Sequence, residues 1–311
     1  MPHVTRREAV AMLAQAGLGL TLAAAGGAGA QEPRPRAARW KFCLNTSTIR
    51  PASLVEKIQA AAKAGFDSLE LWSDELTRYE QEGGSLEDLR KRIEDNGLEV
   101  ASIIALHRWM QTEGEEHKQA LEEARRRLDQ AARLRCPHIV ASPTPNRPGV
   151  DILDAARRYR ELVDLGQRFE VIPAMEFLGF FQNVFRLGQA VAIAIESGHP
   201  LACIVPDTFH MFRGGSGFSG LRHLNGSFLA IFHINDAPAE PPRERQSDAH
   251  RVLPGDGVLP LEQVLRDLRD IGYRGQLSLE LFNRELWKQD PRRVARVGLE
   301  KLREVVARSG A

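Results

Sequence analysis

Cysteine is scarce in this sequence, and the few cysteines present do not form a disulfide framework. The 311 residues include three cysteines, Cys43, Cys136 and Cys203, which are odd in number, widely spaced and without a C-x-x-C pair. Two of them fall in stretches predicted as strands, where a free thiol behaves as a small apolar side chain. We therefore expect buried, unpaired cysteines.

An excess of charge of either sign is also missing. Lys and Arg number 42 against 41 Asp and Glu, so the formal net charge is +1. This balance gives no overall electrostatic footprint for nucleic acid or for an acidic membrane surface. With 43% hydrophobic residues, the 311-residue chain can bury a large core and fits one large α/β domain better than two small ones.

The first thirty residues have the features of an export signal. The Arg6-Arg7 pair precedes an apolar run rich in alanine, glycine and leucine over residues 9–25, and Ala28-Gly29-Ala30 gives a small-residue cleavage pattern. The paired arginines resemble a twin-arginine signal. We expect residues 1–30 to be removed, residues 31–39 to form a flexible leader, and the mature protein to be periplasmic or otherwise exported, with no stable membrane span. The alternative is an uncleaved membrane anchor, which this short, glycine-rich run disfavours.

From Trp40 onward, short apolar runs alternate with amphipathic stretches of helical period. Strands are predicted at 41–44, 66–72, 98–106, 138–141, 171–176, 202–207, 228–233 and 276–280, with helices near 52–64, 85–96, 114–134, 151–169, 187–197, 261–271 and 291–307. Eight predicted strands that alternate with helices predict a single (β/α)8 barrel over residues 40–311. An open doubly wound sheet is disfavoured because no glycine-rich phosphate loop follows the first strand.

Four of the predicted strands change from apolar to ionisable residues at their ends. These residues are Glu176, Asp207, His233 and Glu280. Each one alone is more often a helix cap or a loop contact. In a parallel barrel, however, the carboxyl ends of the strands meet at one face, and like charges crowded there require a cation.

The motifs at the strand ends resemble those of a known family. The strand-end motifs Glu176, Asp207-Thr208-Phe209-His210, His233-Ile234-Asn235-Asp236, Pro254-Gly255-Asp256-Gly257 and Glu280 are similar in order and placement to those of the xylose isomerase-like superfamily of sugar isomerases and epimerases. The resemblance covers nearly all of the mature chain. It implies one divalent metal ion held by Glu176, Asp207, His233 and Glu280. Three carboxylates and one imidazole suit Mn²⁺, Mg²⁺, Co²⁺ or Zn²⁺.

The resemblance also implies a reaction. A metal ion of this kind polarises a ketose carbonyl and stabilises the enediolate that forms when the adjacent C–H bond loses its proton. In related epimerases the corresponding glutamates act as base and acid on opposite faces of the substrate. Glu176 and Glu280 are therefore our candidates for proton transfer.

Five further residues are candidate substrate contacts. They are His210, Arg251, Asp236, His107 and Glu70. Each has a structural alternative. His210 would cap or stabilise a loop, Arg251 would lie on the surface of a long loop, and Asp236 would cap a turn or orient His233. His107 and Glu70 would be ordinary residues at strand ends. Trp72, Trp109 and Trp287 lie near strand ends, where they would either form an apolar wall for a sugar or pack in the core.

The chain departs from the ketose 3-epimerases of this family at two positions. Those enzymes carry a second glutamate six residues after the first metal ligand, where this chain has Gln182. Their arginine six residues after the metal-binding histidine is replaced here by Ala239. These differences weigh against epimerisation of free ketoses by that scheme, while the four ligand positions are intact.

Other chemistries remain open at the level of sequence. A dehydratase or lyase, as in relatives acting on inososes, dehydroshikimate or oxidised glycosides, would use the same proton abstraction and then lose a β-substituent. Apurinic endonucleases bind three zinc ions, and Asp248-Ala249-His250 with His107 resembles part of their set, but Ala141-Ser142-Pro143 supplies no histidine. A non-catalytic binding barrel is disfavoured because all four ligands are present. We expect a small carbohydrate as the substrate, no nucleic-acid partner, and leave homo-oligomer formation open.

Overall fold

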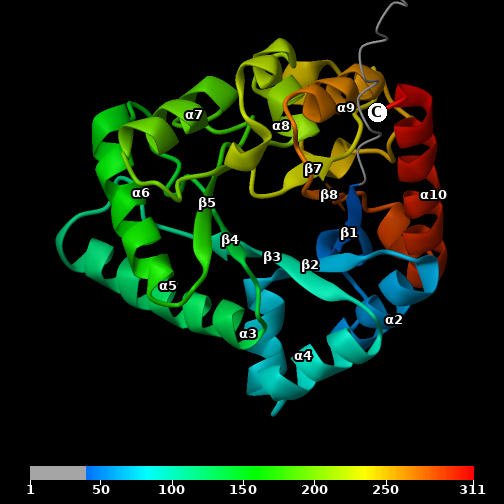
Figure 1. The fold of residues 1–311 in the computed structure, drawn as a ribbon, viewed down its shortest axis with the longest axis horizontal. Helices are drawn as coiled ribbons and strands as arrows, with labels where there is room; N and C mark the ends of the chain where they lie inside the picture. The colour runs from blue at the N-terminus through cyan, green and yellow to red at the C-terminus, as the bar shows by residue number, and fades with distance from the viewer. Residues whose placement is uncertain (1–39) are drawn as a thin grey trace, which may run out of the picture. The chain divides into compact units, whose positions relative to one another are not determined.

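The computed structural model describes residues 40–311, which form a ring of parallel strands surrounded by helices (Figure 1). The (β/α)8 barrel predicted from the sequence is confirmed. The eight strands are β1 Lys41–Asn45, β2 Ser68–Trp72, β3 Glu99–Leu106, β4 His138–Ala141, β5 Ile172–Glu176, β6 Ile204–Val205, β7 Phe232–Ile234 and β8 Gln276–Leu279. The predicted export signal at residues 1–30 and the leader at 31–39 lie outside the described residues.

The ring is nearly closed, and its weakest seam lies between β6 and β7. The strands follow the order β6-β5-β4-β3-β2-β1-β8-β7. Isolated parallel bridges, Ile204 with Leu229 and Asp207 with His233, join the two ends of this order. The amide of His233 donates to the carbonyl oxygen of Pro206 at 3.0 Å. The seam therefore aligns two of the predicted metal ligands side by side.

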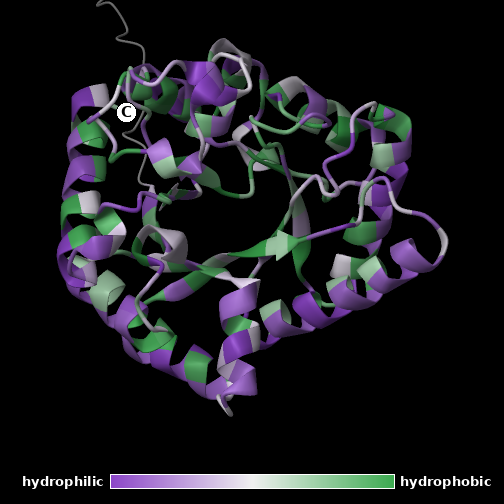
Figure 2. Cartoon of the chain, turned by 180° about the vertical axis from the view of Figure 1, so that it is seen from behind, coloured by the Kyte–Doolittle hydropathy of each residue, from purple (hydrophilic) through white to green (hydrophobic). Residues whose placement is uncertain are grey.

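Helices cover the outside of the ring. They are α2 Leu54–Ala64, α3 Ser73–Gln81, α4 Leu86–Asp95, α5 Gly114–Arg133, α6 Ile152–Gln167, α7 Leu187–Glu196, α8 Thr208–Arg213, α9 Leu261–Asp270 and α10 Pro291–Ser309. Figure 2 shows apolar residues on the strands and on the helix faces that meet them, with hydrophilic residues turned outward. This division is expected when each helix buries one stripe against the sheet.

Local sequence signals set the ends of these helices. Ser53 caps α2 and forms a capping box with Glu56, and Gly65 ends the helix with φ of 93°, a conformation that favours glycine. At the other end of the chain, Asp290 caps α10, which begins at Pro291. The helices α2 and α10 pack beside each other, which closes the outer layer between the first and the last strand.

Two short helices and two strands differ from the expectation. The strand predicted at 202–207 is reduced to the two residues of β6. The helices α3 and α8 each begin directly after a strand-end residue, and their short lengths hide the helical period. The apolar run 228–233 does not form one strand, because residues 226–228 form a 3-10 turn and β7 begins only at Phe232. A Cβ atom on Gly226 would lie 2.2 Å from the backbone nitrogen of Tyr273, so the turn packs directly against a neighbouring backbone.

The interior of the ring is filled by small and medium apolar side chains. This inner cluster comprises Cys43, Ala101, Ile104, Ala105, Val140, Ala174, Cys203, Val205 and Ile231. The three cysteines are buried and free, as predicted. Within residues 40–311, none of the helices is long and apolar enough to cross a membrane.

Tyr159 on α6 ties the short strand β6 to its neighbour. Its side chain is fully buried, and its hydroxyl lies 2.8 Å from the carbonyl oxygens of Pro173 and Cys203. The same hydroxyl accepts a hydrogen bond from the amide of Cys203 at 3.2 Å. Because β6 has only two residues, these contacts contribute to holding the segment that leads to Asp207.

We predict that Tyr159→Phe lowers the free energy of unfolding by about 1–3 kcal/mol, because the amide of Cys203 loses its buried acceptor. Urea denaturation of the variant and the wild type measures the difference. Tyr79→Phe, at a half-buried tyrosine on α3, is the matched control and should change stability by less than about 0.5 kcal/mol. An equal effect of the two substitutions would contradict this role for Tyr159.

Candidate metal centre

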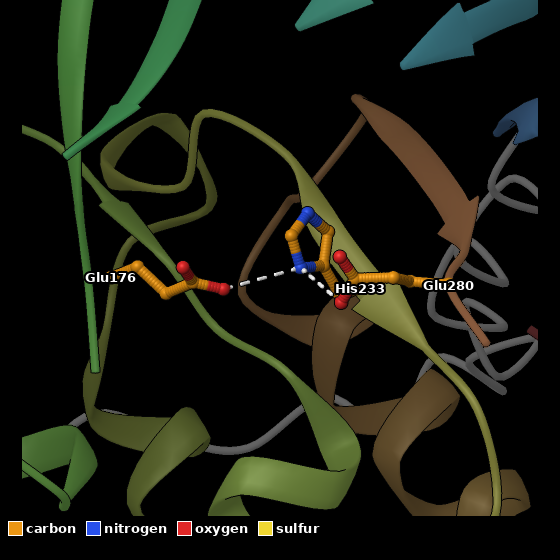
Figure 3. A group of neighbouring side chains, drawn as sticks. All are labelled: Glu176, His233 and Glu280. Atoms are coloured by element: carbon orange, nitrogen blue, oxygen red, sulfur yellow. Dashed lines mark ion pairs between the residues drawn. The ribbon is translucent and has the colours of Figure 1, made fainter. Parts of the chain in front are cut away.

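The structure brings together the four residues predicted as metal ligands. Glu176 ends β5, Asp207 follows β6, His233 lies in β7 and Glu280 follows β8. The Nδ1 atom of His233 lies 3.2 Å from Glu280 Oε2, 3.5 Å from Glu176 Oε1 and 3.8 Å from Asp207 Oδ2. All four side chains are buried. Figure 3 shows the two glutamate carboxylates approaching the same ring nitrogen from opposite sides.

The hydrogen bonding of His233 shows that this cluster fits a metal ion. Within the part of the chain that the structure describes, Nδ1 of His233 is buried and makes no hydrogen bond of acceptable geometry. One ligand atom each from Glu176, His233 and Glu280 lie within 4.8 Å of one another. A buried nitrogen without a partner, surrounded by carboxylate oxygens, has the donor set of a divalent ion. Glu176, His233 and Glu280 would hold the ion, with Asp207 as the fourth ligand.

Asp207 has two tasks. Its Oδ1 atom accepts a hydrogen bond from the amide of His210 at 2.7 Å and so caps α8. Its Oδ2 atom faces His233 and accepts hydrogen bonds from Asn235 Nδ2 at 3.0 Å and from Arg251 Nη1 at 2.9 Å. The sequence left helix capping as the alternative to metal binding. In the structure, Oδ1 caps the helix and Oδ2 is placed to bind the ion.

Arg251 lies inside the cluster, with 1% of its surface exposed. Its Nη1 atom donates to Asp207 Oδ2 at 2.9 Å and to Glu280 Oε2 at 2.8 Å. Asp248 binds its Nε atom at 2.9 Å, and the phenyl rings of Phe209 and Phe282 stack against the guanidinium group. The surface alternative for this arginine therefore does not fit its placement. Arg251 brings a positive charge to the carboxylates.

His210 contacts Arg251 rather than solvent. Its Nε2 atom lies 3.0 Å from Arg251 Nη2, and its Nδ1 atom lies 3.2 Å from the amide nitrogen of Gly179. Burial, together with the charge of Arg251, lowers the pKa of His210 to about 3. The imidazole is therefore neutral at physiological pH, so one ring nitrogen carries a proton and only one can accept a hydrogen bond.

Glu70 lies in the middle of β2 and not at its end, so its placement does not fit a substrate contact. The side chain is 0% exposed. Its Oε1 atom lies 3.0 Å from His233 Nε2, on the side of the ring opposite Nδ1. Its Oε2 atom accepts hydrogen bonds from Asn45 Nδ2 at 2.8 Å and Ser278 Oγ at 2.7 Å. Glu70 supports the histidine from behind.

Asp236 supports a loop, and its placement likewise does not fit a substrate contact or an orienting bond to His233. Its two oxygens accept hydrogen bonds at 2.8–3.1 Å from four backbone amides, those of Ala237, Gly255, Gly257 and Leu259. These bonds fix the Pro254-Gly255-Asp256-Gly257 turn.

His107 follows β3, is exposed, and has Arg127, Glu123 and Asp74 as its charged neighbours. The structure does not bring it into the cluster.

The three tryptophans predicted near strand ends separate into two groups. Trp109 is buried, donates to the carbonyl oxygen of Ser142 at 2.7 Å and packs against Tyr159, so it belongs to the core. Trp72 and Trp287 are half-buried near the strand ends, and both fix nearby backbone or polar groups through their ring N–H. Only these two can contribute to an apolar wall at the site.

Asn45 belongs to the cluster but was not among the residues predicted from the sequence. Asn45 ends β1, and its Nδ2 atom donates to Glu70 Oε2 at 2.8 Å and to Glu280 Oε1 at 3.1 Å. Its Oδ1 atom accepts the hydrogen bond from Trp72 Nε1 at 2.9 Å. The signal that finds the four ligands, a polar residue at the end of an apolar strand, also applies to Asn45.

The protein groups alone produce opposite pKa shifts in the two glutamates. Burial, reinforced by the neighbouring charges of Glu280 and Asp207, raises the pKa of Glu176 to about 7 despite the attraction of His233. Burial also opposes the charge of Glu280, but His233 and Arg251 outweigh it and lower the pKa of that carboxyl. Burial opposes the charge of His233 as well, yet Glu70 and Glu280 raise its pKa well above the ordinary value.

Comparison with known proteins places the chain in a family. A parallel (β/α)8 barrel with carboxylates and a histidine at the carboxyl ends of its strands defines the class of protein. Residues 58–305 match the family described as xylose isomerase-like TIM barrel, and the chain belongs to this family. The resemblance inferred from the strand-end motifs is thereby confirmed at the level of the family.

Individual relatives carry different activities. An inosose isomerase of Halalkalibacterium halodurans is 27% identical over 275 residues, covering 86% of this chain and 97% of that protein. A 3-dehydroshikimate dehydratase of Pseudomonas putida is 25% identical over 258 residues, covering 80% of this chain and 39% of that protein. The crystal structure of an IOLI protein with a bound zinc atom has a TM-score of 0.81 at 25% identity, covering 86% of this chain and 98% of the other.

We predict that metal affinity rises with pH between about pH 6 and pH 8. Glu176, with its pKa raised to about 7, and His233, with its pKa raised above the ordinary value, must both lose protons before they can bind a cation. Below neutral pH the protons compete with the metal ion, so the affinity falls as the pH decreases. Titration with Mn²⁺, with the free ion followed by electron paramagnetic resonance at several pH values, measures the effect. A dissociation constant independent of pH in this range would contradict it.

Proposed function

We propose that this protein is a divalent-metal-dependent isomerase or epimerase that acts on a keto-sugar or a keto-polyol such as an inosose. The observation that carries the proposal is the buried Nδ1 atom of His233, which lacks a hydrogen-bond partner among the described residues and faces the carboxylates of Glu176, Asp207 and Glu280. The similarity to inosose isomerase over nearly the full length of both chains supports the substrate class. The zinc atom bound in a similar structure supports the metal.

The site residues divide the work of such a reaction. When bound, the metal ion supplies positive charge that stabilises the enediolate formed by proton loss next to a carbonyl. Glu176 and Glu280 approach the centre from opposite sides, where they can remove and return a proton on the two faces of a substrate. Arg251 holds Asp207 and Glu280 in place through Nη1.

The two glutamates are held to different degrees. Both oxygens of Glu280 are bound, Oε1 by Asn45 at 3.1 Å and Oε2 by Arg251 at 2.8 Å. Among residues 40–311, Glu176 has only a long contact of 3.4 Å from the hydroxyl of Ser142 in addition to its ion pair with His233. Glu176 is therefore freer to move with a proton, while Glu280 is the more firmly fixed ligand.

A second candidate function is elimination from the same class of substrate. The similarity to 3-dehydroshikimate dehydratase favours it, because proton abstraction next to a carbonyl also begins the loss of a β-hydroxyl group.

We further propose that the mature protein works outside the cytoplasm, because residues 1–30 have the charge pattern, apolar run and cleavage pattern of an export signal. Such a location favours a free carbohydrate over a phosphorylated one.

We expect about one divalent ion per chain in protein purified without chelator, because the cluster offers a single set of four ligands. Elemental analysis measures this stoichiometry. The variant Asp207→Ala should lose most of the metal while its circular dichroism spectrum stays unchanged. No bound ion in the wild type, even after reconstitution, would overturn the proposed metal centre, and about three zinc ions would favour the phosphodiester chemistry of apurinic endonucleases.

We expect solvent deuterium to enter an inosose without loss of water, because the proposed reaction removes a proton next to the carbonyl and returns one to the carbon skeleton. Nuclear magnetic resonance in D₂O follows the exchange, and a parallel assay with 3-dehydroshikimate follows elimination through the absorbance of the conjugated product. Glu176→Gln should reduce the exchange by about 100-fold or more, since general base catalysis typically contributes that much. Elimination without exchange would favour the dehydratase, and full exchange in Glu176→Gln would contradict the assigned role.

A further inference from the structure

Glu70 is an ionisable side chain buried inside the barrel. It is 0% exposed, and its carboxylate contacts three partners from three different strands. They are His233 Nε2 at 3.0 Å, Asn45 Nδ2 at 2.8 Å and Ser278 Oγ at 2.7 Å. Burying a carboxylate costs free energy unless its oxygens are hydrogen-bonded. Two of these contacts lead to the cluster, directly to His233 and through Asn45 to Glu280. An apolar residue at this position would fill a barrel wall without that cost.

We propose that Glu70 is a positioning residue of the metal centre, which holds the imidazole of His233 through Nε2 so that Nδ1 faces the carboxylates of Glu176 and Glu280. This inference rests on the proposed function, because it assumes that Nδ1 binds a metal ion. A carboxylate on the second ring nitrogen of a metal ligand fixes the orientation and the tautomer of the ring and makes the ligating nitrogen more basic. Glu70 is placed to do this, because its carboxylate contacts Nε2 of His233 while Nδ1, on the other side of the ring, faces Glu280.

Asn45 extends this support to a second ligand. Its Nδ2 atom donates to Glu70 Oε2 at 2.8 Å and to Glu280 Oε1 at 3.1 Å, while its Oδ1 atom is held by Trp72 Nε1 at 2.9 Å. One buried carboxylate on β2 thus orients His233 directly and is linked through a single amide group to Glu280. Two of the proposed ligands share one support, so a change at Glu70 should alter metal binding without any contact to the ion.

The variant Glu70→Gln tests the proposal in the full chain. In the wild type, both oxygens of Glu70 face polar groups of Asn45, Ser278 and His233. The substitution replaces one of these oxygens by an NH₂ group, which can only donate hydrogen bonds. The Zn²⁺ dissociation constant, measured by competition with a chromophoric chelator at fixed pH, should increase about 10- to 100-fold, the range found for partners of metal ligands. Urea denaturation of the metal-free protein separates this effect from a change in stability.

Glu75→Gln is the matched control. Glu75 is also a buried glutamate, but it lies on α3 and pairs with Lys57 on α2, outside the ring. Removing its charge should change stability and leave the Zn²⁺ dissociation constant within about twofold of the wild type. Ser278→Ala is a milder second variant that removes one hydrogen bond to Glu70, and it should weaken zinc binding about fivefold.

The outcomes distinguish this inference from the proposed function. A folded Glu70→Gln protein with the wild-type dissociation constant would overturn the positioning role while leaving the metal centre intact. If Glu70→Gln does not fold, Ser278→Ala decides, and an unchanged constant in that variant overturns the role. Wild-type protein that binds no zinc would overturn the proposed function itself, and this inference with it.

Discussion

The repulsion among buried carboxylates at the mouth of the barrel is the constraint on which the site depends. Glu176, Asp207 and Glu280 surround one nitrogen of His233, and all are removed from solvent. Buried like charges are tolerated only with compensating positive charge and hydrogen bonds. Arg251 supplies one such charge from the side. The Nδ1 atom at the centre is buried and has no hydrogen-bond partner among the described residues, and a divalent ion fits this place as a further positive charge.

Much of the fold and the inner part of the site could be predicted from the sequence, because both depend on local patterns. Apolar runs that end in an ionisable residue identify the strands and the face on which Glu176, Asp207, His233 and Glu280 meet. The order of the strands in a barrel can be predicted without knowing contacts between distant residues, since each strand lies beside the strand that follows it in the sequence. The short β6 and the late start of β7 were missed because turns set by backbone packing, as at Gly226, leave no periodic signal.

The residues around the ligands could not be assigned in the same way, because their roles depend on contacts between distant parts of the chain. Glu70 and His233 are 163 positions apart, and a carboxylate in a strand looks the same in sequence whether it faces a substrate or a neighbouring strand. Arg251 belongs to a long loop after β7, and only the return of this loop over the strand ends buries it. The sequence allows Asp236 to be a substrate contact, yet its oxygens are occupied by backbone amides that the sequence does not locate.

The seam between β6 and β7 has a thermodynamic consequence. Isolated bridges join these strands, and two proposed ligands, Asp207 and His233, stand opposite each other across them. A ligand that binds only the folded state adds its binding free energy to the stability of that state. An ion held by both residues would act as a cross-link where the sheet has its fewest hydrogen bonds. Closure of the barrel and occupancy of the site would then be coupled equilibria, so the supply of metal would determine how often this edge of the ring opens.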